Sequence, residues 1–518
     1  MKWILTLLVV PALAFQTPAP DTAKSEKPAE KPTPRQKARQ LLDGVAETAG
    51  SAQPQVAASA MLYVGENYDL FDHKKALEYL HQAFASTVAI PPGREDTRRA
   101  GLQSKIAAAT APLSLPDAID MLKQIQVAPD FEGDPRQRAL TAVVSRLLGK
   151  SQFDDAMELI NSVGSTGPYP FAAARQVFEK LPVDDNRRLS IFAYAMSAYA
   201  LRPGKDFSEL LARHWKELPR SMVQSALGSV IENILKVDDS DQFLSLTLSN
   251  EKGSVNLHSS QDAALFDLMH VVREIDPKRA DEILETRAEL KSALQKFPDG
   301  AIGMGDNVSR SGTSGFGRAD PGLQQRMALE GLAESLSQQA MAAVEKKDFP
   351  KAISLAKSIP APERRVEILT RIASGAGALD QTTAKAMIGE CIDALKEVKD
   401  PAVRASSWNN IAEAAHRAGD DKLAWEAIDH SLDDSAELYK ADVNADSPNE
   451  ALRDEWPSTN SYRRAVITAT KLMGVDAEPL LGQIADRDLA LFARVEMAQT
   501  LLERPHESWS TSVSRTSK

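Results

Sequence analysis

The sequence has little cysteine, few aromatic residues and no excess of positive charge, and each shortage excludes a class of protein. A single cysteine, Cys391, in 518 residues rules out an internal disulfide framework and any zinc site that needs several cysteines. Aromatic residues make up 6% of the chain, so stacked-ring platforms for sugars or bases are scarce. The formal net charge of -11 argues against a nucleic-acid partner, because such binding needs a basic face that displaces phosphate counterions.

Long hydrophobic runs are also lacking. The apolar run from Trp3 to Ala14 is shorter than the roughly 20 helical residues that span a bilayer, and no later segment reaches that length without charges. Lys2 precedes this run, and the small residues Ala12 and Ala14 end it, which is the pattern of a secretory signal cleaved after Ala14. We therefore predict that residues 1–14 are a signal peptide, that the protein is periplasmic or secreted, and that it has no transmembrane anchor.

Both ends of the mature chain lack the apolar residues that a packed core requires. Residues 15–35 are rich in Pro, Ala, Lys, Glu and Thr, a composition typical of a disordered tether. Residues 506–518 are rich in Ser and Thr and are predicted to be a disordered tail.

From residue 36 onward the sequence has a helical period. Apolar residues recur at i, i+3, i+4 and i+7 in segments rich in good helix formers. Alternating runs of Val, Ile and Thr, which are typical of strands, are lacking. The predicted helices are short, come in pairs, and are separated by Pro and Gly. The first helix of a pair follows an acidic residue, as at Asp134, Glu363 and Asp400, because such a side chain accepts hydrogen bonds from the free amides of the first turn.

The second helix of each pair carries a small residue that is followed by an apolar residue four positions later and, in four of the five pairs, by another seven positions later. The small residues are Ala76, Ala118, Ala156, Ala352 and Ala424, and the first three lie about 40 residues apart, which is a repeat period. A small side chain at one fixed place lets two helices approach closely. This pattern predicts an all-α fold, an α-solenoid of stacked antiparallel helical hairpins.

Two of these pairs resemble the tetratricopeptide family, whose pattern is W-x2-L-G-x2-Y, then A-x3-F and a late Pro. One pair contains Trp408, Ile411 and Ala412 followed by Ala424 and Ile428. The other contains Leu140, Val143, Val144 and Leu147, followed by Ala156, Ile160 and Pro168. The Gly of the pattern is usually replaced, the Tyr is absent, and the period exceeds 34 residues. The chain therefore resembles tetratricopeptide-like helical repeats, with a HEAT-like array as the alternative.

A glycine-rich break interrupts the pattern. Residues 298–322 contain seven glycines, which favours a flexible linker between an N-terminal array over residues 36–297 and a C-terminal array over residues 323–505. The segment does not match a phosphate-binding loop, because Gly303 and Gly305 are not followed by the third glycine or by Gly-Lys-Ser/Thr.

The sequence contains no complete catalytic or metal-binding pattern. Asp442, Asn444 and Asp446 match the first three oxygen positions of a calcium loop, but Ser447 replaces the turn glycine and Arg453 replaces the bidentate glutamate. We therefore expect residues 442–454 to form an acidic connecting loop. The eight histidines include no H-E-x-x-H pair, and no Gly-x-Ser-x-Gly elbow is present. We predict no catalytic residue, no metal and no cofactor.

The candidate binding surface lies on the helix that contains Trp408. If Trp408 faces the core, Asn409, Glu413 and His416 project from the opposite side, with Asn410 adjacent. The resemblance to tetratricopeptide units implies that asparagine at such a place hydrogen-bonds the main chain of a bound peptide. We predict that Asn409, Asn410, Glu413 and His416 contact a partner in the groove.

Arginines recur in the predicted first turns, where the positive end of the helix dipole disfavours them. They are Arg98, Arg136, Arg188, Arg365 and Arg404. We expect each of them to form an ion pair with an acidic residue of the neighbouring hairpin; a groove that selects acidic ligands is the alternative.

Two functions fit these patterns. The first is an exported, non-enzymatic scaffold that binds a protein or peptide in its groove, with no nucleic acid and no metal. The alternative is an all-helical cell-envelope enzyme that acts on peptidoglycan or polysaccharide, for which the low aromatic content is unfavourable.

Overall fold

The computed structural model describes residues 31–90, 97–127, 134–165, 167–237, 242–250, 253–305, 309–316, 321–377, 380–444 and 453–502. Helices dominate these residues. The predicted signal peptide, most of the predicted tether and the predicted C-terminal tail lie outside them.

The helices follow one another as hairpins. The first group comprises α1 (Pro34–Ala49), α2 (Pro54–Tyr68), α3 (His73–Thr87), α4 (Thr97–Thr110), α5 (Leu115–Gln124), α6 (Gln137–Gly149), α7 (Phe153–Gly164), α8 (Phe171–Lys180), α9 (Arg187–Leu201), α10 (Lys205–His214), the 3₁₀ turn η1 (Trp215–Glu217) and α11 (Arg220–Lys236). The middle group comprises β1 (Gln242–Asn250), β2 (Gly253–Leu257), α12 (Ser260–Ile275), α13 (Pro277–Glu285), α14 (Ala288–Lys296), α15 (Gly300–Met304) and β3 (Ser309–Phe316). The last group comprises α16 (Pro321–Glu345), α17 (Phe349–Lys357), α18 (Pro362–Ala376), α19 (Gln381–Leu395), α20 (Pro401–Arg417), α21 (Asp421–Asn444), η2 (Arg453–Glu455), α22 (Pro457–Met473), η3 (Gly474–Gln483) and α23 (Arg487–Leu501).

The predicted helix start at Asp400 is confirmed and Asp276 begins α13 in the same way, whereas Glu363 lies inside the first turn of α18, after Ala361 and Pro362. Asp276 and Asp400 each accept a hydrogen bond from a backbone amide of the helix that follows, and proline occupies its first position. The start near Asp134 differs, because α6 begins three residues later. Asp134 instead accepts a hydrogen bond from the backbone amide of Arg136 and pairs with the guanidinium of the same residue.

Small residues hold the hairpins together, as the sequence predicts. Ala76, Ala118, Ala156, Ala352 and Ala424 lie on α3, α5, α7, α17 and α21, and all five are buried. The chain thus folds as an α-solenoid of stacked antiparallel hairpins, in which a first helix packs against the first helices on both sides. The successive contacts of α4, α6, α8, α10 and α12, and of α16, α18, α20 and α22, form this inner layer.

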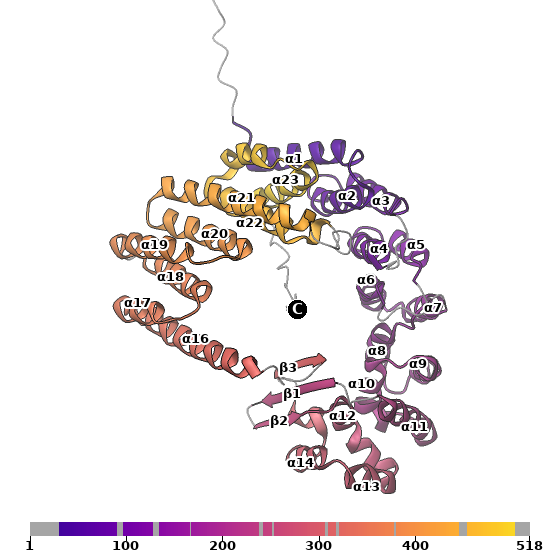
Figure 1. The fold of residues 1–518 in the computed structure, drawn as a ribbon. Helices are drawn as coiled ribbons and strands as arrows, with labels where there is room; N and C mark the ends of the chain where they lie inside the picture. Colours follow the sequence, from indigo (N-terminus) through magenta and orange to yellow (C-terminus); the bar gives the residue numbers. More distant parts are fainter. Residues whose placement is uncertain are drawn as a thin grey trace, which may run out of the picture.

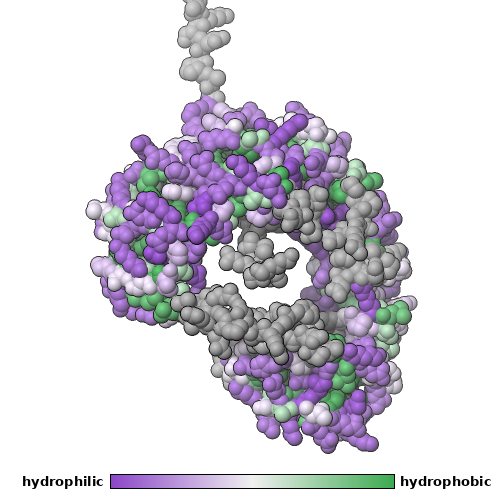
Figure 2. Space-filling view, in the orientation of Figure 1, coloured by the Kyte–Doolittle hydropathy of each residue, from purple (hydrophilic) through white to green (hydrophobic). Residues whose placement is uncertain are grey.

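The solenoid closes on itself as a ring. Figure 1 shows the helices following a circle, with α1 beside α23 although the two lie at opposite ends of the chain. Lys37 of α1 forms an ion pair with Glu478 of η3, with 2.5 Å between Nζ and Oε2. Lys105 of α4 forms another with Glu455 of η2, with 2.8 Å between Nζ and Oε1. The space-filling view shows that the ring encloses a central opening (Figure 2).

A small antiparallel sheet is an addition that the sequence reasoning missed. Its strand order is β2-β1-β3, and β1 pairs with both neighbours. In β1, Leu244, Leu246 and Leu248 alternate with Ser and Thr, which is the period of a strand. Leucine is a strong helix former, so the composition of this segment obscures its period.

The glycine-rich segment is not structureless throughout. It contains α15 and β3, and α16 begins at Pro321. Gly300 requires glycine, because its φ is +63° and a Cβ there would clash with the backbone carbonyl of Phe266 on α12. The close packing of α15 on α12 depends on this residue. The division of the chain into two arrays at residues 298–322 stays a prediction.

Among the described residues, no helix is both long enough and apolar enough to cross a bilayer. Cys391 lies in the core of α19, fully buried, as the pattern of neighbouring apolar residues predicts. Burial raises the pKa of its thiol to about 12.

Candidate functional site

The predicted partner-binding residues all lie on α20, but they do not share one exposed face. Asn409 is buried, with 3% of its surface exposed, which contradicts the expectation that it projects into the groove. The reason is that α20 packs against α18 on one side and α22 on the other, so the exposed sector of an inner helix is narrow. Within the described part of the chain, neither the side-chain nitrogen nor the oxygen of Asn409 has a hydrogen-bond partner.

The other three predicted residues reach the surface. Asn410 and Glu413 are partly exposed and His416 is exposed. Glu413 lies 3.6 Å from the guanidinium of Arg417, measured between Oε2 and Nη2. His416 Nδ1 lies 2.7 Å from Oδ1 of Asp421, which begins α21. This part of α20 therefore presents the amide of Asn410, the carboxylate of Glu413 beside Arg417, and the imidazole of His416 beside Asp421. Its binding role stays a prediction.

Arg188, Arg365 and Arg404 form ion pairs, as expected, and Arg136 pairs with Asp134, two residues before it. Arg188 on α9 pairs with Glu217 of η1, which belongs to the next hairpin. Arg365 pairs with Glu397, which follows α19, and Arg404 pairs with Asp434 of α21. The last two partners lie in the same hairpin as the arginine, so the expected neighbouring hairpin is correct only for Arg188. The ion pairs favour the structural explanation of these arginines over a groove for acidic ligands.

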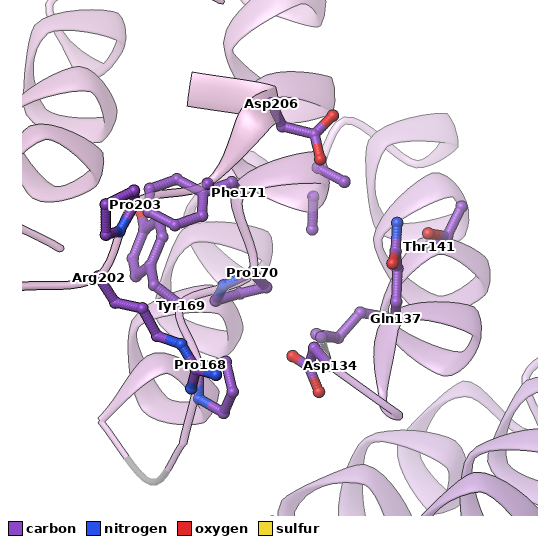
Figure 3. Close-up of a pocket in the computed structure, with 14 residues that line it drawn as sticks. Asp134, Gln137, Thr141, Pro168, Tyr169, Pro170, Phe171, Arg202, Pro203 and Asp206 are labelled. Carbon is purple, nitrogen blue, oxygen red and sulfur yellow. The ribbon is translucent and has the colours of Figure 1, made fainter. Parts of the chain in front are cut away.

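A pocket that the sequence reasoning missed lies where α6, α8 and α10 begin (Figure 3). Its volume is about 170 Å³. The residues that line it are Asp134, Gln137, Leu140, Thr141, Pro168, Tyr169, Pro170, Phe171, Ala172, Ala173, Arg202, Pro203, Gly204 and Asp206. The sequence signals that could have revealed it are the two proline-containing loops Pro168–Pro170 and Arg202–Gly204, each of which precedes an inner helix. We call it the rim pocket.

Arg136 fixes the first of these loops. Its side chain is 1% exposed, and its two terminal nitrogens donate hydrogen bonds of 3.0 Å each, one to the carbonyl of Val163 and one to that of Pro168. Its Nε donates to Asp134 Oδ1 at 2.9 Å. Because charge-assisted bonds of this kind are stronger than neutral ones, the loop and the pocket wall that it forms are held in place without a ligand.

Aromatic rings build the apolar wall of the pocket. The centroids of Tyr169 and Phe171 are 5.1 Å apart, and Phe171 lies 6.2 Å from Phe207 of α10. A Cβ at Gly204 would lie within 2.5 Å of Phe171 Cδ2, so glycine at this position leaves room for the ring. Burial raises the pKa of Tyr169 above its usual range, which keeps its hydroxyl protonated.

Both carboxylates in the pocket already have cationic partners. Asp134 pairs with Arg136, and Asp206 lies 3.3 Å from the guanidinium of Arg175. Both lie at the start of a helix, where negative charge is favoured by the dipole.

The apolar surface continues outside the pocket. Leu201, next to the lining residue Arg202, is 90% exposed, and Tyr194 on the same helix is 55% exposed. Tyr194 lies near enough to Tyr169 of the pocket wall to contribute to the raised pKa of Tyr169. By contrast, the described residues contain no group of three or more His, Cys, Asp or Glu side chains that could hold a metal ion.

The predicted calcium-like loop lies largely outside the described residues. At its described ends, Asp442 belongs to α21 and accepts a hydrogen bond from the backbone amide of Ser458 at 2.9 Å. Arg453 pairs with Asp488 of α23. Both side chains therefore take part in packing α21, α22 and α23 together.

Comparison with known proteins gives no sequence match. No family model and no curated protein matches the chain. Among solved structures, Ton1535 from Thermococcus onnurineus NA1 is 11% identical, with a TM-score of 0.20, covering 89% of this chain and 98% of that one. A chain of the APC/C hetero-tetramer Cut9-Hcn1 is 12% identical, with a TM-score of 0.18, covering 87% and 96%. A circular tandem repeat protein with novel repeat topology is 12% identical, with a TM-score of 0.15, covering 90% and 96%.

Scores this low say nothing about function. The stacked hairpins of the chain itself show that this is a helical-repeat protein. Its resemblance to tetratricopeptide-like units holds at the level of the fold. Both units that carry the resemblance are hairpins, α6 with α7 and α20 with α21.

Proposed function

We propose that this protein is an exported, non-enzymatic scaffold that binds a protein or peptide partner. The observation that carries the proposal is the ring of stacked hairpins, because a solenoid offers an extended surface built from one side of many helices. Within that surface, Asn410, Glu413 and His416 offer hydrogen-bond donors and acceptors from α20. Asn409 of the same helix is buried and does not reach the surface.

The ion pairs in the rim pocket favour a binding role over catalysis. An enzyme that cleaves polysaccharide by the common route needs one carboxylic acid that keeps its proton and one free carboxylate. Asp134 and Asp206 are instead paired with arginines. The scaffold is therefore preferred to the all-helical envelope enzyme.

Capture of a partner tests the binding role. The mature chain, from Phe15, is immobilised and exposed to envelope extract, and retained proteins are identified by mass spectrometry. We expect one reproducible partner whose recovery falls at least tenfold in the double variant Asn410→Ala with His416→Ala. The matched control is Lys422→Ala with Glu426→Ala, which removes an exposed pair from the outer helix α21 and should leave recovery unchanged. Equal recovery in both double variants would exclude the surface on α20.

Export is a separate part of the proposal and has its own test. In a Gram-negative host that expresses the full sequence, we expect the protein in the periplasmic or secreted fraction with Phe15 as its first residue. Leu8→Arg interrupts the apolar run and should leave the full-length chain in the cytosol. An intact N-terminus in a cytosolic wild-type protein would refute the signal peptide.

A further inference from the structure

The rim pocket is too small for most small-molecule ligands. Pockets that enclose a drug-sized ligand or cofactor have volumes of about 300–1,000 Å³. At about 170 Å³ the rim pocket has room for little more than one large side chain. Its size thus points to a single anchoring group of a larger partner, as found at the centre of many protein interfaces.

The walls of the pocket differ in chemistry. Tyr169 and Phe171 lie on one side together with Pro203, and Gln137 and Thr141 of α6 face them from the other side (Figure 3). The apolar wall suits an aromatic or branched aliphatic side chain, since aromatic pairs gain about 0.5–1.5 kcal/mol beyond burial. The amide of Gln137 and the hydroxyl of Thr141 can hydrogen-bond a peptide main chain.

Local charge favours an uncharged anchor. The carboxylate of Asp134 is neutralised by Arg136, and that of Asp206 by Arg175. A cationic side chain entering the pocket would lose hydration without gaining an unpaired carboxylate, and Arg202, which also lines the pocket, already takes part in other interactions. The exposed side chains of Leu201 and Tyr194 add apolar surface beside the pocket for the residues that flank the anchor.

We infer that the rim pocket is the anchor site for a phenylalanine or leucine side chain in an extended segment of the partner protein. This inference rests on the proposed scaffold function and names the part of the partner that is recognised. The pocket is held open by the hydrogen bonds of Arg136 to Val163 and Pro168, so that no rearrangement is needed for entry.

Small amides test the pocket independently of any partner. The probes are N-acetyl-phenylalaninamide and N-acetyl-leucinamide, with N-acetyl-glycinamide as the negative probe, and binding to the full mature chain is followed by saturation-transfer NMR. We expect the first two to bind and the glycine amide not to bind. Failure of both apolar amides to bind the wild-type protein would overturn the inference.

Two substitutions on α6 block the pocket, and a third on the same helix supplies the control. Thr141→Trp places a large ring in the pocket from an exposed position, and Gln137→Trp does so from a second one. Arg146→Trp introduces the same side chain at an exposed position of the same helix outside the pocket lining. We expect at least a tenfold loss of amide binding in the first two variants and none in the third. Equal binding in all three variants would place the amides elsewhere and overturn the assignment.

Partner capture separates the two proposals. If Thr141→Trp loses both the amide and the partner, the pocket is the anchor site. If wild type and Thr141→Trp capture the same partner equally, the scaffold function stands and the anchor assignment fails. If the amides bind as expected but no partner is captured, the scaffold function fails. Concentration-dependent self-association that Thr141→Trp abolishes would assign the pocket to a second copy of this chain, which would overturn the assignment to another protein.

Discussion

The hydroxyl of Tyr63 on α2 donates a hydrogen bond of 2.8 Å to Oδ2 of Asp454, a residue 391 positions later in the sequence. The same ring lies 6.3 Å from that of Phe492 on α23 and beneath the guanidinium of Arg463, 5.0 Å from the ring centroid. Burial raises the pKa of Tyr63 well above its usual value, so the phenol remains a donor at all physiological pH values. The two ends of the chain are thus joined by a specific polar contact as well as by apolar packing.

Tyr63→Phe removes this contact and keeps the ring. Because the buried carboxylate of Asp454 then loses a donor, we expect the free energy of unfolding to fall by about 1–3 kcal/mol. Tyr194→Phe is the control, since Tyr194 is exposed and its substitution should change stability by less than about 0.5 kcal/mol. Urea denaturation gives the free energy of unfolding of both variants. Equal effects would show that the contact does not stabilise the fold.

Arg463 and Glu496 form a second buried contact beside the first. Both are less than a tenth exposed, and they join α22 to α23. Glu496→Gln removes the negative charge and leaves the arginine buried, so we expect a loss of about 3–5 kcal/mol. Exchanging both residues for Met should cost less than the single substitution, because neither member of the pair is then left as an unpaired charge, and Asp454, which Arg463 also attracts, keeps its hydrogen bond from Tyr63. A double variant as unstable as Glu496→Gln would contradict this explanation.

Two glycines should respond oppositely to alanine. Gly300→Ala places a Cβ against the carbonyl of Phe266 at a positive φ, and we expect it to lower the melting temperature and loosen α15. Gly228→Ala lies within α11 with no atom near the added Cβ, and it should stabilise the chain by about 0.5–1 kcal/mol. Thermal unfolding by circular dichroism tests both. A neutral Gly300→Ala would show that α15 does not require this close approach.

The buried amide of Asn409 is expected to reduce stability, because its two polar atoms have no hydrogen-bond partner among the residues that the structure describes. Asn409→Leu keeps the approximate volume and removes the desolvation cost, so we expect the free energy of unfolding to rise by about 1 kcal/mol. The neighbouring substitution Asn410→Leu at a partly exposed position should give no such gain. Loss of stability in Asn409→Leu would indicate that the amide is hydrogen-bonded in solution.

The thiol of Cys391 predicts a dependence on pH. Its pKa is raised to about 12 in the folded chain from 9.0 in the open chain, so above pH 9 the unfolded state binds fewer protons than the folded state. The thiol therefore lowers stability as pH rises through this window, by up to about 1.4 kcal/mol per pH unit. Comparing wild type with Cys391→Ala at pH 8 and pH 10 isolates the effect. Relative to wild type, Cys391→Ala should be more stable at pH 10 than at pH 8. A difference in free energy of unfolding that does not change with pH would contradict the burial of the thiol.

The hairpins were predictable from sequence because the helical period and the small residues, such as Ala76 and Ala156, are local signals. The burial of Asn409 was not, since it depends on how closely α18 and α22 flank α20. The rim pocket was missed for the same reason: Gln137, Phe171 and Asp206 lie on α6, α8 and α10, which belong to three different hairpins, and only their stacking brings them together. Ring closure is likewise a long-range contact. No local pattern indicates that Tyr63 meets Asp454.

Zero-length crosslinking tests the closed ring most directly. A carbodiimide joins a lysine amine to a carboxylate only when the two are in contact, as Lys37 and Glu478 are across the seam, and Lys105 and Glu455 beside it. Lys357 and Glu390, 2.8 Å apart within the C-terminal half, provide the internal control. Peptide mapping of the crosslinked monomer should find all three isopeptide bonds if the chain closes as a ring. Recovery of the bond between Lys357 and Glu390 without the other two would show that the solenoid is open.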